Sequence, residues 1–265
     1  MTDSTNKPTR YYLCSDTQVG LFSAIYEAGL SQYGHRFVRI LILPPNGCYD
    51  QKLFAEYIPV KEHYKKMQSV LRSIQDRLSY RVYHSVMSAS ASTFPDRGDV
   101  IYQFITYAFS MGDKVCDAMQ LPFVKRMFEI QRRVQNEAHY LREFIRFREV
   151  QSSPPLLAAT IEPTHHVLPM IMDHFCQRFA EEAFVILDYA HQEAAFHTTK
   201  NNWALKTLSE EETKQLYELC EQQEEYVGLW KTFFEHITIE ERINRDLQRN
   251  MLPIHYRKHL TEFQE

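Results

Sequence analysis

The sequence predicts an α+β fold that is mostly helical, with a small N-terminal β-α-β element and a β-α-β-β unit around residues 156–198. The central part of the chain repeats apolar residues at helical spacing, which is typical of packed helices. Short runs rich in β-branched and aromatic residues flank it on both sides, as in strands. A composition that is 44% hydrophobic and 24% charged suits a globular protein with a sizeable core.

Residues 1–60 are expected to form the β-α-β element after a polar tail of about ten residues. Residues 10–15 and 37–43 are typical of strands, and Pro44-Pro45-Asn46-Gly47 ends the second one. Residues 18–30 between them predict a helix with Leu21, Phe22 and Ile25 facing inward.

Residues 61–150 are expected to be a helical region. One helix is predicted over residues 62–88, and Pro95 with Gly98 interrupts the pattern after it. The next helix covers residues 100–119, with a boundary or kink at Met111-Gly112. Pro122 then stands where a further helix begins, which is the helical position that tolerates proline best.

Residues 151–265 are expected to contain a small sheet followed by C-terminal helices. Residues 151–155 predict a linker, residues 156–161 a strand, and residues 167–179 a helix. Residues 183–188 and 194–198 predict a β-hairpin. Ser209 with Glu212, and Thr238 with Glu241, have the spacing of capping boxes, so a helix is expected to begin at each.

Basic residues recur every seven positions in the helix that begins at Pro122. Lys125, Arg132, His139 and Arg146 would lie along one side of it over about 30 Å, and a second basic region follows near residue 245. Such residues could position nucleic acid by phosphate contacts, or they could only solvate the helix and pair with acids such as Glu143. The residues predicted to contact nucleic acid are Lys125, Arg132, His139, Arg142, Arg146, Arg148, Arg242 and Arg249.

Composition restricts the other kinds of site. The formal net charge is −4, so a nucleic-acid surface must be a local patch. The 7 glycines form neither a Rossmann nor a P-loop motif. The 5 cysteines are widely spaced, so no metal site or cofactor is expected, and they suit a reducing cytoplasm. We also expect no signal peptide and no membrane span.

One group of titratable residues is close enough together in the sequence to be considered as a catalytic centre. Glu162, His165 and His174 lie in and just after a proline turn. Carboxylate and imidazole together can transfer protons or bind a divalent metal, but the spacing matches no metal motif. The alternative is that these side chains cap a helix or bond to the backbone.

Several of these segments carry a family likeness. The chain resembles a bacterial family of DNA-metabolism proteins of undefined activity over nearly its whole length, most closely from about residue 100 onward. The matching pieces are Tyr12-Leu13, Gly20-Leu21, Glu137-Ala138-His139, Phe144-Ile145-Arg146-Phe147-Arg148, Glu162-Pro163, His174-Phe175, Arg178-Phe179, residues 229–234, residues 239–242 and Leu260-Thr261-Glu262-Phe263. Two positions depart from the pattern: Arg257 stands where tryptophan is usual, and His191 where arginine is common.

The resemblance implies a role linked to DNA. In that family the C-terminal portion also occurs fused to uracil-DNA-glycosylase-like domains, and the stand-alone form accompanies a radical S-adenosylmethionine protein of DNA repair or modification. The expectation is therefore a cytoplasmic accessory protein that binds DNA of unspecified form and leaves the chemistry to that partner. An enzyme using Glu162, His165 and His174, and an adaptor that binds protein instead of DNA, are the alternatives.

Overall fold

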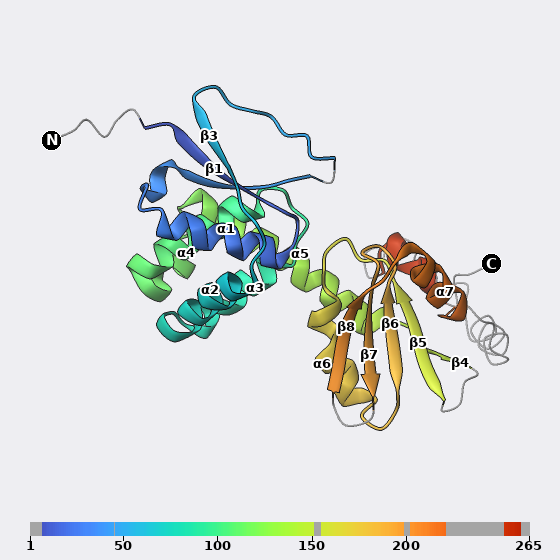
Figure 1. Ribbon diagram of the computed structural model, residues 1–265. Helices are drawn as coiled ribbons and strands as arrows, with labels where there is room; N and C mark the ends of the chain where they lie inside the picture. The colour runs from blue at the N-terminus through green and yellow to red at the C-terminus, as the bar shows by residue number, and fades with distance from the viewer. Residues whose placement is uncertain (1–6, 45, 151–154, 199–201, 221–251, 261–265) are drawn as a thin grey trace, which may run out of the picture. The chain divides into compact units, whose positions relative to one another are not determined.

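The computed structural model describes residues 7–44, 46–150, 155–198, 202–220 and 252–260. These residues contain helices α1 to α7 and two sheets (Figure 1), which confirms the α+β class. The chain divides into two compact units, Met1–Gln135 and Asn136–Glu265. Within the described residues, no helix has both the length and the apolar character needed to cross a membrane.

Unit 1 is built on a parallel three-stranded sheet with the order β2-β1-β3. Arg10 of β1 pairs with Val38 on one side and with Glu56 on the other. The first two strands and the helix between them confirm the predicted β-α-β element, whereas the third was not predicted. The elements are β1 (Thr9–Cys14), α1 (Gln18–Leu30), β2 (Val38–Ile42) and β3 (Ala55–Pro59).

The helical part of unit 1 differs from the prediction in two places. Gly98, which was expected to interrupt the pattern, lies inside a helix that begins at Arg97. The single helix expected over residues 62–88 is two helices, because Leu78 is extended and the Ser79 hydroxyl caps a new helix by accepting from the Val82 N–H. The Met111-Gly112 boundary is confirmed, since Gly112 ends its helix with a φ of +61°. The elements are α2 (Tyr64–Arg77), α3 (Tyr80–Ser90), α4 (Arg97–Met111), a 3₁₀ helix (Gly112–Asp117) and α5 (Pro122–Phe144).

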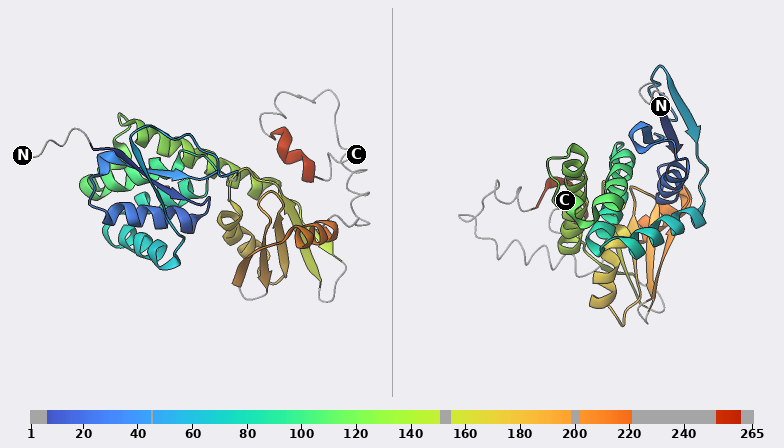
Figure 2. Two further views of the ribbon diagram at one scale, coloured as in Figure 1. Left: turned by 45° about the horizontal axis from the view of Figure 1, so that its top comes forward. Right: turned by 90° about the vertical axis from the view of Figure 1, so that its left-hand side faces the viewer.

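The core of unit 1 forms where helices cover this small sheet (Figures 1 and 2). Helices α1 and α4 both contact β2. Gly98 permits the close approach of α4, because a Cβ there would come within 3.0 Å of the Ile40 side chain. The predicted inward residues Leu21, Phe22 and Ile25 are all buried. The apolar seam of α5 is buried as well, through Val124, Met127, Ile130 and Val134.

Unit 2 is built on a five-stranded sheet with the order β4-β5-β6-β7-β8. Strands β5 and β6 are parallel and are joined through α6, and the other neighbours are antiparallel. This confirms the predicted β-α-β-β unit, to which the structure adds β4 and β8. The elements are β4 (Arg148–Val150), β5 (Leu156–Ile161), α6 (Leu168–Arg178), β6 (Phe184–Asp188), β7 (Glu193–Thr198), β8 (Asn202–Thr207), α7 (Glu210–Cys220) and a 3₁₀ helix (Ile254–His259).

Both faces of β6 are covered, and every residue of this strand is buried. Val185 and Leu187 join the core cluster that includes Cys220 of α7. Because alternate residues point to opposite faces of a sheet, Phe184 lies on the other side, where its ring meets an aromatic group containing Phe179. A strand buried on both faces has the near-continuous apolar sequence seen here.

Helix α7 begins with the predicted capping box. The Ser209 backbone N–H donates to the Glu212 carboxylate at 2.9 Å, and the Glu212 N–H donates to the Ser209 hydroxyl at 3.2 Å. The two bonds satisfy donors that the first turn of a helix leaves open. The second predicted box, Thr238 with Glu241, lies outside the described residues.

Candidate nucleic-acid interface

The first half of α5 carries three exposed basic side chains. Lys125, Arg132 and Arg133 project from the solvent side of the helix, opposite the buried residues Met127 and Ile130. No other described residue forms a hydrogen bond or ion pair with these three side chains. Their charges are therefore available to a partner. Arg133 was not among the predicted contacts, because it lies outside the seven-residue repeat, but it is exposed like Arg132.

Arg126 on the same helix already has acidic partners. Its guanidinium donates to both carboxylate oxygens of Asp96, at 2.7 Å and 3.1 Å, and comes within 3.5 Å of Glu129. It also lies 4.8 Å above the Phe94 ring. The hydrogen bonds from Arg126 lower the pKa of Asp96, as expected for a carboxylate held by a guanidinium. The charges of Arg126 and Asp96 thus neutralise each other, and the unpaired positive charge of α5 is that of the other exposed cations.

The predicted basic residues of unit 2 that the structure describes have internal partners. The ring of His139 lies 3.1 Å from the Glu143 carboxylate, which is the pairing that the sequence left open. Arg142 donates to the Met170 carbonyl of α6 at 3.0 Å. Arg146 points back at the end of α5 and donates to the Phe144 carbonyl at 3.3 Å, one of the acceptors that a helix end leaves open. Arg148 is only 9% exposed, in β4.

The turn at residues 162–166 is held by a buried carboxylate that the sequence analysis named only as part of the family likeness. Glu137 of α5 is 6% exposed, and it accepts from the backbone N–H groups of Thr164 at 2.7 Å and His165 at 2.8 Å. His165 is itself buried, and Glu162 is half-buried. The sequence did hold a signal for this burial: Glu137 lies between Val134 and Leu141 on the apolar face of the helix.

His174 lies on the exposed side of α6. Partial burial lowers its pKa, and the positive charges of Arg142 and Arg178 lower it further. The structure thus brings His174 together with Arg142, a residue predicted to contact nucleic acid. This edge of unit 2 therefore has hydrogen-bond donors, the two guanidinium groups, beside an acceptor, the neutral imidazole.

A family model matches residues 95–262 of the chain, which is more than half of its length. The family is described as a domain of unknown function, DUF4130. The chain belongs to this family. The DUF4130 match begins just before α4, so it includes the basic face of α5, Glu137 and the sheet of unit 2. No curated protein matches the sequence.

Within the DUF4130 region, a second group of titratable residues lies where β5 and β6 end. The buried carboxylate of Asp188 accepts from the His191 backbone N–H at 3.1 Å and lies 2.7 Å from its Nδ1. The His191 ring is 4.0 Å from that of His166. Burial raises the pKa of Asp188. Burial alone would lower the pKa of His191, but the hydrogen bond and charge of Asp188 outweigh it and raise that pKa.

This arrangement explains why His191 can replace the arginine common in the resembling family. Either side chain offers a nitrogen donor to Asp188, and the carboxylate can then fix the turn between β6 and β7.

Two predicted residues of the DUF4130 region, Arg242 and Arg249, lie outside the described residues. Of the tail that follows, Tyr256 is half-buried, and its ring lies 5.5 Å from that of Tyr140 on α5. Arg257, which departs from the resembling family, donates to the Leu252 carbonyl at 3.3 Å and 3.2 Å. Its guanidinium therefore has an internal role in the tail.

Proposed function

We propose that this protein is a cytoplasmic accessory factor of DNA repair or modification that positions nucleic acid through the exposed cations of α5. The proposal rests chiefly on Lys125, Arg132 and Arg133, which are exposed and have no partner among the described residues. The neighbouring cation Arg126, by contrast, is bound by two acids. A local basic face suits an acidic protein, because only that surface would attract a polyanion.

The spacing of these cations suits a phosphate backbone. Seven residues separate Lys125 from Arg132, which is about 10 Å along a helix. Along one strand of duplex DNA the phosphates follow one another at about 3.4 Å of axial rise, so the two side chains would reach phosphates about three nucleotides apart. Contacts of this kind orient a protein on nucleic acid without reading sequence.

The resemblance to DNA-metabolism proteins supports both DNA as the ligand and a radical S-adenosylmethionine protein as the partner. A radical S-adenosylmethionine protein would supply the chemistry, and this chain would deliver or hold the DNA. An enzymatic role for Glu162, His165 and His174 is the alternative. The burial of His165 and the use of its backbone N–H by Glu137 favour a structural role for that turn.

Binding of labelled DNA across a salt series tests the proposal. Replacing both Arg132 and Arg133 with glutamine should make the log–log salt slope less steep by about 1.8 on duplex DNA and by about 1.4 on single strands, because each phosphate contact contributes about 0.9 or 0.7. Fluorescence anisotropy gives both slopes from the same titrations.

The matched control removes two charges from another exposed helix of the same unit. Lys65→Gln/Arg72→Gln on α2 changes the net charge equally and should leave the slope unchanged. Equal weakening by both double variants would mean that net charge, rather than the face of α5, attracts DNA. Binding that is absent or insensitive to salt would favour the protein adaptor instead.

A further inference from the structure

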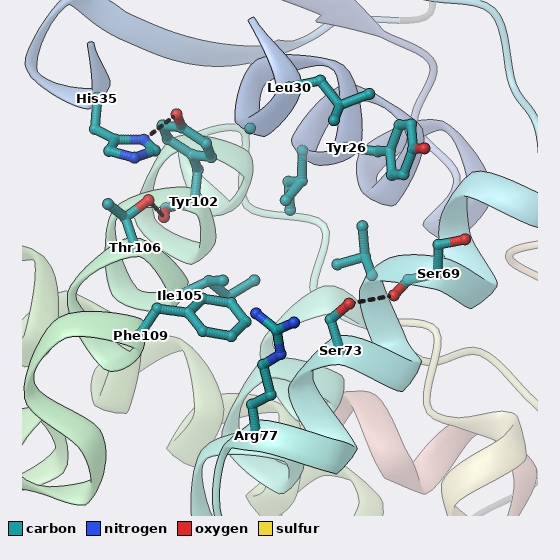
Figure 3. A pocket seen from close by; sticks show the side chains of 13 residues that line it. Tyr26, Leu30, His35, Ser69, Ser73, Arg77, Tyr102, Ile105, Thr106 and Phe109 are labelled. Carbon is teal, nitrogen blue, oxygen red and sulfur yellow. Dashed lines mark hydrogen bonds between the residues drawn. The ribbon is translucent and has the colours of Figure 1, made fainter. Parts of the chain in front are cut away.

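Unit 1 contains a pocket that the proposed role does not use (Figure 3). It has a volume of about 460 Å³, within the range of sites for small organic ligands, and lies among α1, α2 and α4. Its walls are largely apolar. The apolar lining residues are Ile25, Leu30, Val70, Ile105 and Phe109.

The mouth of the pocket leaves large apolar side chains in water. Leu30 is 61% exposed and Phe109 is 45% exposed, and both line the cavity. Covering them with an apolar ligand would release about 25 cal/mol for each Å² removed from water. The pocket therefore favours a ligand with an apolar body.

The charge of the pocket is positive. Arg77 at the end of α2 lines it, and Figure 3 shows its guanidinium turned toward the other lining side chains. No other described residue forms an ion pair or hydrogen bond with this guanidinium, and no described aspartate or glutamate lines the cavity. A guanidinium that no described side chain binds offers paired donors to a carboxylate, sulfonate or phosphate.

A polar pair stands on the far wall of the pocket. Tyr102 is 2% exposed, and its hydroxyl lies 2.7 Å from Nδ1 of His35. Burial raises the pKa of Tyr102 to about 12, so its hydroxyl keeps its proton and shares a hydrogen bond with that nitrogen. Both residues also line a neighbouring hollow of about 340 Å³ that contains Arg36 and Arg39 and, among its described lining, no acid. Of these two arginines, Arg39 lies 3.5 Å from the Asp99 carboxylate, so its charge is partly neutralised.

We propose that this pocket binds a small amphipathic organic anion, whose apolar body lies between α1 and α4 and whose acidic group meets Arg77. The site lies in unit 1 and includes none of the α5 cations. Its occupancy can therefore be measured separately from DNA binding.

The test uses two dyes that differ in charge. 8-Anilinonaphthalene-1-sulfonate has an aromatic body and one sulfonate, and N-phenyl-1-naphthylamine has the same body without it. Fluorescence titration of the full-length protein should show one saturable site for the sulfonate. Arg77→Gln should weaken the sulfonate about tenfold, as expected when one charge-assisted contact is lost, and should leave the neutral dye unchanged.

A second variant fills the pocket. Gly29 lines it, and a Cβ added there would meet nothing within 4 Å, so Gly29→Leu should fold and should abolish binding of both dyes. Arg72→Gln, on the same helix as Arg77 but outside the lining, is the charge-matched control and should bind like the wild type. Unchanged sulfonate affinity in Arg77→Gln, or saturable binding retained in folded Gly29→Leu, would overturn the proposal.

Discussion

Replacing Glu137 with alanine should lower the free energy of unfolding of unit 2 by about 3–6 kcal/mol. The carboxylate accepts two backbone hydrogen bonds, from Thr164 and His165, and hydrogen bonds to charged groups contribute about 1.5–3 kcal/mol each. Alanine would also leave the buried His165 N–H without its acceptor. Urea unfolding followed by tryptophan fluorescence measures this, since both tryptophans, Trp203 and Trp230, belong to unit 2.

A control variant separates this effect from the loss of negative charge. Glu143→Ala, further along α5, removes an exposed carboxylate paired with His139 and should cost no more than about 0.5 kcal/mol. Equal losses in the two variants would show that the Glu137 contacts do not hold the turn. Glu137→Gln keeps one acceptor oxygen and should fall between them.

Phe184→Ala should have a comparable effect by a different mechanism. The ring is fully buried, and its centroid lies 5.5 Å from that of Phe147, 6.1 Å from that of Phe179 and 4.6 Å from that of His197. Its removal leaves a cavity among side chains from several elements, and such changes cost about 3–5 kcal/mol. The same urea titration measures the loss.

Phe196→Ala on the neighbouring strand is the comparison. Phe196 is 38% exposed, so the same truncation there should cost about 1 kcal/mol or less. If both phenylalanine variants lost the same stability, strand propensity rather than the aromatic cluster would explain the effect.

Elements with a strong local pattern could be predicted from the sequence. Helix α1 and strand β5 lie where their periodicity placed them, and the Ser209–Glu212 box forms as its spacing indicated. Strands β3, β4 and β8 were missed, and each is an edge strand that pairs with a single neighbour, β1, β5 or β7. The Ala55–Pro59 strand, for example, is short and contains a glutamate and a proline, and it acquires its conformation from its neighbour β1.

The candidate interface could also be predicted only in part from local sequence patterns. Spacing identified the exposed cations Lys125 and Arg132, since helical periodicity determines which face a residue occupies. It could not show that Arg142 donates to a carbonyl 28 residues away, or that Arg148 is buried in a strand. Those partners depend on how α5 packs against α6 and the sheet of unit 2, which a local pattern does not encode.

The most direct test of the central claim is chemical footprinting of α5 on DNA. Acetylation of exposed lysines, read by mass spectrometry with and without saturating DNA, reports contact at single residues. Lys125 and Lys65 are both exposed on helices, and they belong to α5 and α2 respectively. DNA should protect Lys125 and leave Lys65 as reactive as before. If bound DNA left Lys125 fully reactive, α5 would not be the surface that positions nucleic acid.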